Sequence, residues 1–198
     1  MCGGCTPCCP PARYVEQMAA GSIVVRPAEA AADLAGIDAV DVSYSTDRIY
    51  RVRRNKLSFW LEEERFELPV EKADLRPALT LSEGLFVACR GETIVGYGEL
   101  QPELWNGRAR IDNIFVSRPS RGQGVGGRLI EALAEQASHQ PRARCLWLET
   151  QNVNYPAVQF YLKMGFRLCG LDETLYRPDD PQLLPGEMAL YFARDLPH

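Results

Sequence analysis

A glycine-rich segment that begins with an arginine, Arg121-Gly122-Gln123-Gly124-Val125-Gly126, stands between two patterned segments. The apolar residues before it, Ile111 to Val116, predict a strand, and the residues from Val125 onward predict an amphipathic helix. Glycine lets the backbone approach a ligand closely, and the first turn of a helix has amide N–H groups without helical partners. Together with the positive end of the helix dipole, these amides can hold a pyrophosphate group.

Side chains suited to proton transfer lie before and after this loop. Glu149 lies at the end of a predicted strand, and Asp112 lies on the strand before the glycines. Either carboxylate, or Glu99 on an earlier strand, could take a proton from an amine, and Tyr161 on a second predicted helix could give one to a leaving group. The ordinary alternatives are that the carboxylates are ion-paired and that Tyr161 is a packed core aromatic.

The composition describes an ordinary globular chain. Of its 198 residues, 46% are hydrophobic and 24% are charged, and the formal net charge is -4. This balance argues against a nucleic-acid partner and permits a cationic one. No apolar run is long enough to span a membrane, and the first residues lack the apolar core of a signal peptide. We therefore expect a cytoplasmic protein with reduced thiols and no membrane partner.

The cysteines fall into two groups. Four crowd the start of the chain in overlapping CxxC spacings that suit zinc or an iron–sulfur cluster, Cys2, Cys5, Cys8 and Cys9. No second ligand pair follows at the usual distance, so we expect a loose tail over residues 1–20 and no metal. Three others lie in or beside apolar stretches and are expected to be small core residues, Cys89, Cys145 and Cys169.

The hydrophobic pattern predicts the elements that position these residues. Alternating apolar residues from Ile49 to Val70, around a turn at Arg54-Asn55-Lys56, predict a β-hairpin. Further strands are predicted at Ser22–Arg26, Leu85–Arg90, Thr93–Leu100, Arg108–Val116, Cys145–Thr150, Phe166–Leu171 and Met188–Ala193. Helices are predicted at Pro27–Gly36, at Val125–Gln140 and from Pro156 to a stop at Gly165.

The glycines alone would also fit a nucleotide-binding fold. A dinucleotide fold repeats βαβ units and places an acidic residue on a following strand, where Glu149 lies near the expected distance. The hairpins predicted before the glycine loop argue against that fold. The segment Gly127-Arg128-Leu129 does not supply the lysine and hydroxyl residue of a Walker loop.

Two motifs, in this order, resemble the hallmarks of one family. Arg121-x-x-Gly124-x-Gly126 is similar to the acetyl-CoA loop of the GNAT superfamily of N-acetyltransferases. The segment from Asn154 to Phe166 is similar to its second motif, N-x-x-A-x-x-F-Y-x-x-x-G-F. A narrower likeness, to the streptothricin acetyltransferases, rests on Leu148–Asn154, Gly170–Asp172 with Leu175-Tyr176, and Gly186–Tyr191. It is close in the second half of the chain and loose over residues 22–80.

The resemblance implies a fold and an activity. The fold would be α/β, with a mixed, mostly antiparallel central sheet flanked by helices in one domain over residues 21–198. Residues 108–170 would bind acetyl-CoA and residues 49–70 would form an acceptor-side hairpin. Acetyl would pass directly to a primary amine of a small cationic acceptor, such as a streptothricin-like antibiotic. Acetylation of a protein N-terminus or lysine, a non-catalytic acetyl-CoA-binding module and a homodimer stay open.

The resemblance also implies roles for individual residues. Glu149 is the favoured base, with Asp112 and Glu99 as alternatives, and Tyr161 is the acid for the departing thiolate. The acetyl-CoA-binding residues would be Ile114, Phe115, Val116, Arg121, Gly122, Gln123, Gly124, Val125, Gly126 and Asn154. Arg128 is either a solvated helix residue or a phosphate ligand. An acidic run either attracts the cationic acceptor or is a solvated surface, Glu62, Glu63, Glu64 and Glu67.

Overall fold

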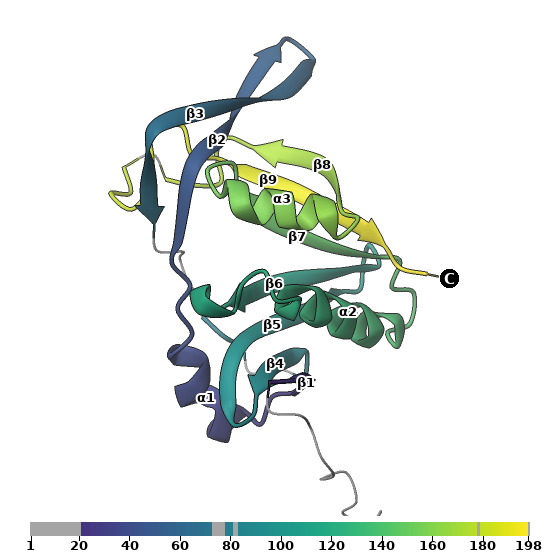
Figure 1. Ribbon diagram of the computed structural model, residues 1–198. Helices are drawn as coiled ribbons and strands as arrows, with labels where there is room; N and C mark the ends of the chain where they lie inside the picture. Colours follow the sequence, from purple (N-terminus) through teal and green to yellow (C-terminus); the bar gives the residue numbers. More distant parts are fainter. Residues whose placement is uncertain (1–20, 73–77, 81–82, 178, 198) are drawn as a thin grey trace, which may run out of the picture.

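The computed structural model describes residues 21–72, 78–80, 83–177 and 179–197. In this part of the chain the strands form a seven-stranded sheet in the order β1-β4-β5-β6-β7-β9-β8 and a separate two-stranded sheet, β2-β3. Among these strands, neighbours are antiparallel except β6 and β7, which run parallel. Helices α2 and α3 lie on one face of the large sheet (Figure 1). The expected mixed, mostly antiparallel α/β fold is confirmed.

The predicted elements of the main sheet are found with small shifts at their ends. Its strands are β1 (Ile23–Pro27), β4 (Leu85–Arg90), β5 (Thr93–Glu103), β6 (Arg108–Val116), β7 (Cys145–Gln151), β8 (Arg167–Asp172) and β9 (Ala189–Asp195). The helices are α1 (Ala30–Asp38), the short 3-10 turn η1 (Arg118–Ser120), α2 (Val125–Ser138) and α3 (Tyr155–Lys163). The predicted start of α1 at Pro27 is wrong, because Pro27 still pairs with Phe86 as the last residue of β1.

The predicted hairpin exists and is longer than expected. It consists of β2 (Tyr44–Asn55) and β3 (Ser58–Lys72), and Figure 1 shows it reaching out beyond the main sheet. The turn lies at Lys56 and Leu57, where Lys56 has a φ of 42°. The predicted turn at Arg54 and Asn55 is wrong, since both residues still pair across the strands, with Phe59 and Ser58 respectively.

Hydrophobic side chains fill both faces of the main sheet. On β4, Phe86 and Ala88 join the cluster beneath α2, whereas Val87 and Cys89 join a second cluster with Ile37 of α1. This alternation is the period of two that a strand requires. The two helices α1 and α2 therefore cover opposite faces of this half of the sheet.

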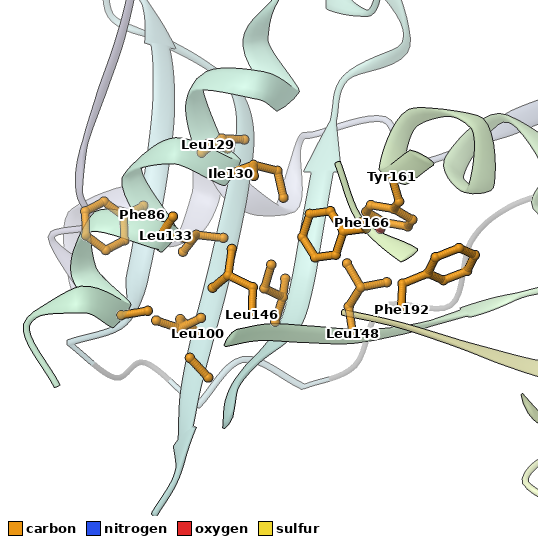
Figure 2. Packing of buried hydrophobic residues seen from close by; sticks show 14 of the residues in the cluster. Phe86, Leu100, Leu129, Ile130, Leu133, Leu146, Leu148, Tyr161, Phe166 and Phe192 are labelled. Carbon is orange, nitrogen blue, oxygen red and sulfur yellow. The ribbon is translucent and has the colours of Figure 1, made fainter. Parts of the chain in front are cut away.

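Helix α2 packs through the side predicted from its periodicity. Leu129, Ile130 and Leu133 are fully buried, and they belong to the same cluster as Leu100 and Leu146 of the sheet (Figure 2). Aliphatic side chains three and four residues apart share one face of a helix, and for this reason the sequence alone predicts this contact.

The remaining cysteines differ from the expectation in one case. Cys89 and Cys145 are buried core residues, as predicted. Cys169 is exposed, so that prediction is wrong: it lies at an irregularity of the β8–β9 pairing, and its thiol contacts the Tyr191 carbonyl at 3.4 Å. The cysteines of the tail lie outside the described residues. Among those described, no group of His, Cys, Asp or Glu could hold a metal ion.

Within the described part of the chain, no helix is both long and apolar enough to cross a membrane.

Candidate active site

The parallel strands β6 and β7 separate part of the way along the sheet. Their pairing joins Arg108–Ile111 to Cys145–Leu148 and extends no further among the described residues. The last five residues of β6 and the end of β7 therefore diverge, and Figure 1 shows α2 beside one of these strands and α3 beside the other. This divergence opens an edge of β6 in the middle of the sheet.

A β-bulge at Asp112 marks the point of divergence. Leu100 of β5 faces Ile111, while the adjacent Glu99 faces Asn113, so Asp112 is the extra residue on β6. A bulge shifts the alternation of side chains by one residue. Residues after Asp112 consequently point to the faces opposite to those that simple alternation predicts.

The backbone after the bulge is directed into the opening. The Ser117 amide donates to the Val95 carbonyl at 2.8 Å, which places Ser117 in a hydrogen-bonded pair with β5. Since such pairs alternate along antiparallel strands, the backbone groups of Ile114 and Val116 point away from β5 and toward the opening. An extended ligand arm could pair there as a strand does.

A pocket of about 450 Å³ lies at this opening, between α2, α3 and the end of β6. It brings together most of the predicted acetyl-CoA-binding residues and one catalytic candidate, namely Ile114, Phe115, Val116, Arg121, Gly122, Gly124, Val125, Gly126, Asn154 and Tyr161. Two residues at the start of the hairpin, Val42 and Tyr44, also line it and had not been predicted. Gln123, Glu149 and Asp112 do not line it.

The glycines of the loop serve different purposes. Gly122 and Gly124 have φ values of 74° and 81°, a conformation that residues with a Cβ rarely adopt. Gly124 is the N-cap of α2, so its turn directs the first amides of the helix at the pocket. Gly126 is needed for another reason, because a Cβ there would lie 2.9 Å from Cζ of Phe160 on α3.

Arg121 holds the loop against its neighbours. Its Nε donates to the Val116 carbonyl at 2.9 Å, and its Nη2 donates to the Asp41 carbonyl at 3.4 Å. The guanidinium therefore ties the loop to the end of β6 and to the segment before β2. Its positive charge remains at the pocket lined by the glycines.

Two other polar residues of this region do not point at the pocket. Gln123 donates to the Pro119 carbonyl at 2.9 Å and accepts from Arg90, so its side chain is held outside. Arg128 donates to the Ile23 carbonyl at 2.7 Å. Arg128 is an exposed residue of α2 and does not line the pocket, which favours the solvated-residue alternative, and its guanidinium also links α2 to β1.

Tyr161 is both a packed aromatic and a pocket residue. Its ring centroid lies 5.4 Å from that of Phe160. It lies 5.8 Å from that of Phe166 and 6.1 Å from that of Phe192, the two rings labelled near it in Figure 2. The aromatic neighbours fix the ring in place on α3. Asn154 begins the same helix, and its side chain accepts from the Ala157 amide at 3.2 Å as the N-cap.

Glu149 lies on the other face of β7. Leu148 points into the core beneath α3, so the adjacent Glu149 points to the opposite side. Its carboxylate accepts a hydrogen bond from the Tyr176 hydroxyl. Tyr176 belongs to the connection between β8 and β9, and only its place in the narrower family likeness could have indicated it from the sequence.

An aromatic surface adjoins Glu149. Trp147 and Tyr191 stack with ring centroids 5.0 Å apart, and Tyr191 faces Glu149 across the β7–β9 pairing. Burial, followed by the charges of Asp172 and Glu149, raises the pKa of the Tyr191 hydroxyl. A neutral phenol and a carboxylate therefore lie side by side on this face.

The alternative bases have partners of a different kind. Asp112 forms an ion pair with Arg110. Glu99 is fully buried and accepts from the Thr80 amide at 2.9 Å and from Nδ2 of Asn113 at 2.8 Å. Both carboxylates are thus held by donors that stabilise them where they are.

Three residues of the acidic run on the hairpin, Glu62, Glu63 and Glu64, are paired with arginines of the opposite strand. Glu64 lies 2.6 Å from Arg51, and Glu62 lies 2.9 Å from Arg53. These cross-strand ion pairs favour the surface alternative for the run, because the arginines offset its negative charge.

A glycine loop at a helix start, an open strand edge beside it and a tyrosine at the inner end define a class of protein. The loop suits a pyrophosphate, the strand edge suits an extended amide-containing arm, and the tyrosine suits a departing thiolate. These residues fit acetyl-CoA, and the arrangement is that of an acyl-CoA-dependent transferase.

Comparison with known proteins indicates the same class of enzyme. The Acetyltransferase (GNAT) family matches residues 46–166, and this chain belongs to that family. The chain is 31% identical to streptothricin acetyltransferase of Streptomyces lavendulae over 83% of its own length and 91% of that protein. The protein is thus an acetyl-CoA-dependent N-acetyltransferase, which confirms the resemblance seen in the two motifs.

Solved structures extend the comparison. The crystal structure of nourseothricin acetyltransferase matches with a TM-score of 0.77 and 34% identity, covering 88% of this chain and 99% of that one. A putative streptothricin acetyltransferase from Bacillus anthracis, solved in complex with acetyl coenzyme A, matches with a TM-score of 0.74 and 26% identity. It covers the same shares of the two chains.

Proposed function

We propose that this protein acetylates a primary amine of a small cationic acceptor, and that streptothricin is such an acceptor. The extent of the match to nourseothricin acetyltransferase carries this proposal, since it covers 88% of this chain. A match of that extent has to include much of the hairpin and of the C-terminal connection, the parts outside the acetyl-CoA pocket. Residues 21–198 would act as one domain, with residues 108–170 binding acetyl-CoA and residues 49–70 on the acceptor side. A cytoplasmic location and a homodimer stay predictions.

Glu149 would take the proton from the acceptor amine. An amine with a pKa of about 10 is protonated at neutral pH, so it needs a base before it can attack the thioester. The Tyr176 hydroxyl orients the Glu149 carboxylate as a neutral donor. Asp112 remains the alternative, but taking up a proton would cost it the ion pair with Arg110.

The pocket residues would position acetyl-CoA, the acetyl donor. Amides of the glycine loop would hold the pyrophosphate of acetyl-CoA, while the backbone of Ile114 and Val116 would hold the pantetheine arm. Tyr161 would protonate the departing thiolate, and this assistance is modest because a thiol is a tolerable leaving group. Transfer would be direct, since none of the three described cysteines, Cys89, Cys145 and Cys169, lines the pocket.

An acceptor panel tests the proposal. The protein is incubated with acetyl-CoA and with streptothricin, spermidine or a peptide that has an unblocked N-terminus, and released thiol is measured. We expect streptothricin to have the highest kcat/KM, and we expect expression of the protein to raise the resistance of a susceptible bacterium. Efficient peptide acetylation with unchanged susceptibility would instead indicate a protein acetyltransferase. Acetyl-CoA binding without turnover of any amine would indicate a non-catalytic module.

A further inference from the structure

The hairpin has to be held in place by contacts outside its own sheet. A two-stranded hairpin alone is marginally stable in water, and β2-β3 forms no strand pairing with the seven-stranded sheet among the described residues. Yet Val42 and Tyr44 at its start line the acetyl-CoA pocket. The way in which the hairpin is fastened therefore affects both sides of the active site.

Asn152 makes the most extensive of these contacts. It is fully buried directly after β7, and its backbone carbonyl accepts from the Tyr50 amide at 3.0 Å. Its Nδ2 donates to the Tyr50 carbonyl at 2.8 Å and to the Gly186 carbonyl at 3.3 Å. Asn152 thus joins β2 as a strand residue would, using its side chain to complete the bridge.

The same residue also holds the connection before β9. The Asn152 amide donates to the Met188 carbonyl at 3.0 Å, and the Met188 amide donates to Oδ1 of Asn152 at 2.9 Å. The backbone N–H, the backbone C=O and both side-chain polar atoms of Asn152 are therefore all engaged. An asparagine suits this position because its amide is both donor and acceptor.

Two further contacts act on the same parts of the chain. Lys72 at the end of β3 forms an ion pair with Glu187, whose side chain is fully buried. Tyr50 stacks on Tyr155 of α3 with ring centroids 5.2 Å apart, and its hydroxyl accepts from Gln159 at 2.6 Å. The hairpin is thus attached to the connection before β9 and to α3, with Asn152 between them.

The position of Asn152 in the chain connects these contacts to the chemistry. It lies between Glu149, the proposed base, and Asn154, which caps α3 at the edge of the acetyl-CoA pocket. The connection that it holds also contains Tyr176, the donor to Glu149. Asn152 therefore links the hairpin and the Gly186–Met188 segment to the end of β7, the strand that carries the proposed base.

We propose that Asn152 is a positioning residue that fixes the β2-β3 hairpin and the Gly186–Met188 segment before β9 against the end of β7, and so sets the acceptor side of the active site. This inference rests on the proposed function in assigning the hairpin to the acceptor side. It also gives a physical role to Asn152 and to Gly186–Met188, two parts of the narrower likeness that acetyl-CoA binding does not use.

The test compares Asn152→Asp with the unmodified protein. The substitution keeps the shape and the acceptor for the Met188 amide but replaces Nδ2, so the contacts with the Tyr50 and Gly186 carbonyls become repulsive. We expect the KM for the acceptor to rise about tenfold, the loss that one or two such hydrogen bonds represent. The Kd for acetyl-CoA should change by less than about twofold, because the pocket lining is retained.

A direct measurement of the hairpin accompanies the kinetics. The arginines and the lysine around its turn are trypsin sites, and cleavage there requires the hairpin to open. Asn152→Asp should be cut faster between residues 48 and 56 than the unmodified protein. Lys72→Met, which removes the second attachment, should give a smaller change in the same direction. It also serves as the test variant if Asn152→Asp does not fold.

Asp33→Asn is the matched control. It also changes a buried side chain that makes several hydrogen bonds, since the Asp33 carboxylate accepts from Arg26 and from the Glu29 amide. Asp33 lies on α1, away from the hairpin. A similar rise in acceptor KM in this control would overturn the proposal, as would faster cleavage of the Asn152 variant with an unchanged acceptor KM. The kinetics use whichever panel amine the unmodified protein acetylates best. A failure of streptothricin as acceptor is thereby distinguished from a failure of this inference.

Discussion

At the scale of single residues, Gly126 and Phe160 set how closely α2 approaches α3. Both line the pocket that we propose binds acetyl-CoA, and a Cβ added at Gly126 would lie 2.9 Å from Cζ and 3.1 Å from Cε2 of the Phe160 ring. Contacts this short force an aromatic ring or a helix to move. The distance between the two helices, and with it the width of the pocket, depends on the absence of a side chain at this position.

Gly126→Ala should lower the free energy of unfolding by about 1–3 kcal/mol through overpacking. A second substitution, Phe160→Leu, should restore part of that loss. Gly124→Ala is the control: a Cβ there meets nothing within 4 Å, and its cost of about 1–2 kcal/mol arises from the positive φ. Chemical denaturation measures all three. If Phe160→Leu restored the stability of Gly126→Ala and of Gly124→Ala equally, contact with the Phe160 ring would not be the cause of the loss in Gly126→Ala.

Glu149 is the residue on which the proposed chemistry depends. Glu149→Gln keeps an oxygen that can accept from Tyr176 but removes the base, so kcat/KM near neutral pH should fall by about 100-fold or more. The rate should recover partly as the pH approaches the acceptor amine pKa of about 10, where the amine deprotonates without help.

Tyr161→Phe separates the two catalytic roles. It should lower kcat about tenfold without alkaline recovery and leave the Kd for acetyl-CoA nearly unchanged. A silent Glu149→Gln beside a severe Asp112→Asn would assign the base to Asp112 instead.

At the scale of elements, α1 is fastened to β1 through one buried carboxylate. Asp33 accepts from Arg26 at 2.7 and 2.8 Å and from the Glu29 amide at 2.8 Å. The Arg26 guanidinium, aided by the Glu29 amide, holds the pKa of Asp33 below its ordinary value. The helix has no side-chain cap at its N-cap residue, so Asp33 supplies the bond that closes its first turn.

Asp33→Asn should cost about 1.5–3 kcal/mol of stability at neutral pH, the range for hydrogen bonds to charged groups. Because the pKa of Asp33 is lower in the folded state, its contribution is fully present above the unfolded pKa of about 3.9. It is lost as the pH falls through the folded value. Denaturation curves of the two proteins should therefore converge below about pH 4. A constant difference down to pH 2 would contradict the ion-pair explanation.

At the scale of the whole molecule, the pocket is formed by parts far apart in the chain. Val42 and Tyr44 lie at the start of the hairpin, Ile114 to Val116 end β6, and Asn154 to Met164 comprise α3 with its two caps. A ligand in this pocket contacts both halves of the divided sheet. Binding should therefore stabilise the molecule as a unit rather than one segment of it.

Acetyl-CoA at 100 times its Kd should add about 2.7 kcal/mol of stability. For a protein of this size that corresponds to a rise in Tm of roughly 5–10 °C. Thermal unfolding with and without acetyl-CoA measures the shift, and NAD is the control. No shift with acetyl-CoA, or a larger one with NAD, would contradict the assignment of the pocket.

The charges on the hairpin surface should attract a cationic acceptor only weakly. The acidic residues of the hairpin are offset by arginines across the strands, as in the Glu64–Arg51 and Glu62–Arg53 pairs. Exposed pairs of this kind are screened by salt and worth little individually. Raised salt should consequently change the acceptor KM only modestly, by less than about threefold, in the thiol-release assay.

Local pattern by itself determined most of the elements and the helix ends that line the pocket. Strand β6 and the buried face of α2 follow from periodicity, and the Asn154 cap and the Gly165 stop of α3 follow from backbone chemistry that acts within a few residues. These signals do not depend on distant parts of the chain.

Tertiary structure alone decided the contacts between segments that are distant in the chain. The bulge at Asp112 shifts every following side chain of β6 by one face, and no local pattern announces it. The Tyr176 donor to Glu149, the Arg128 link to β1 and the exposure of Cys169 likewise depend on long-range register and packing. Such contacts join residues far apart in the chain, whose meeting is set by how the sheet and helices pack together.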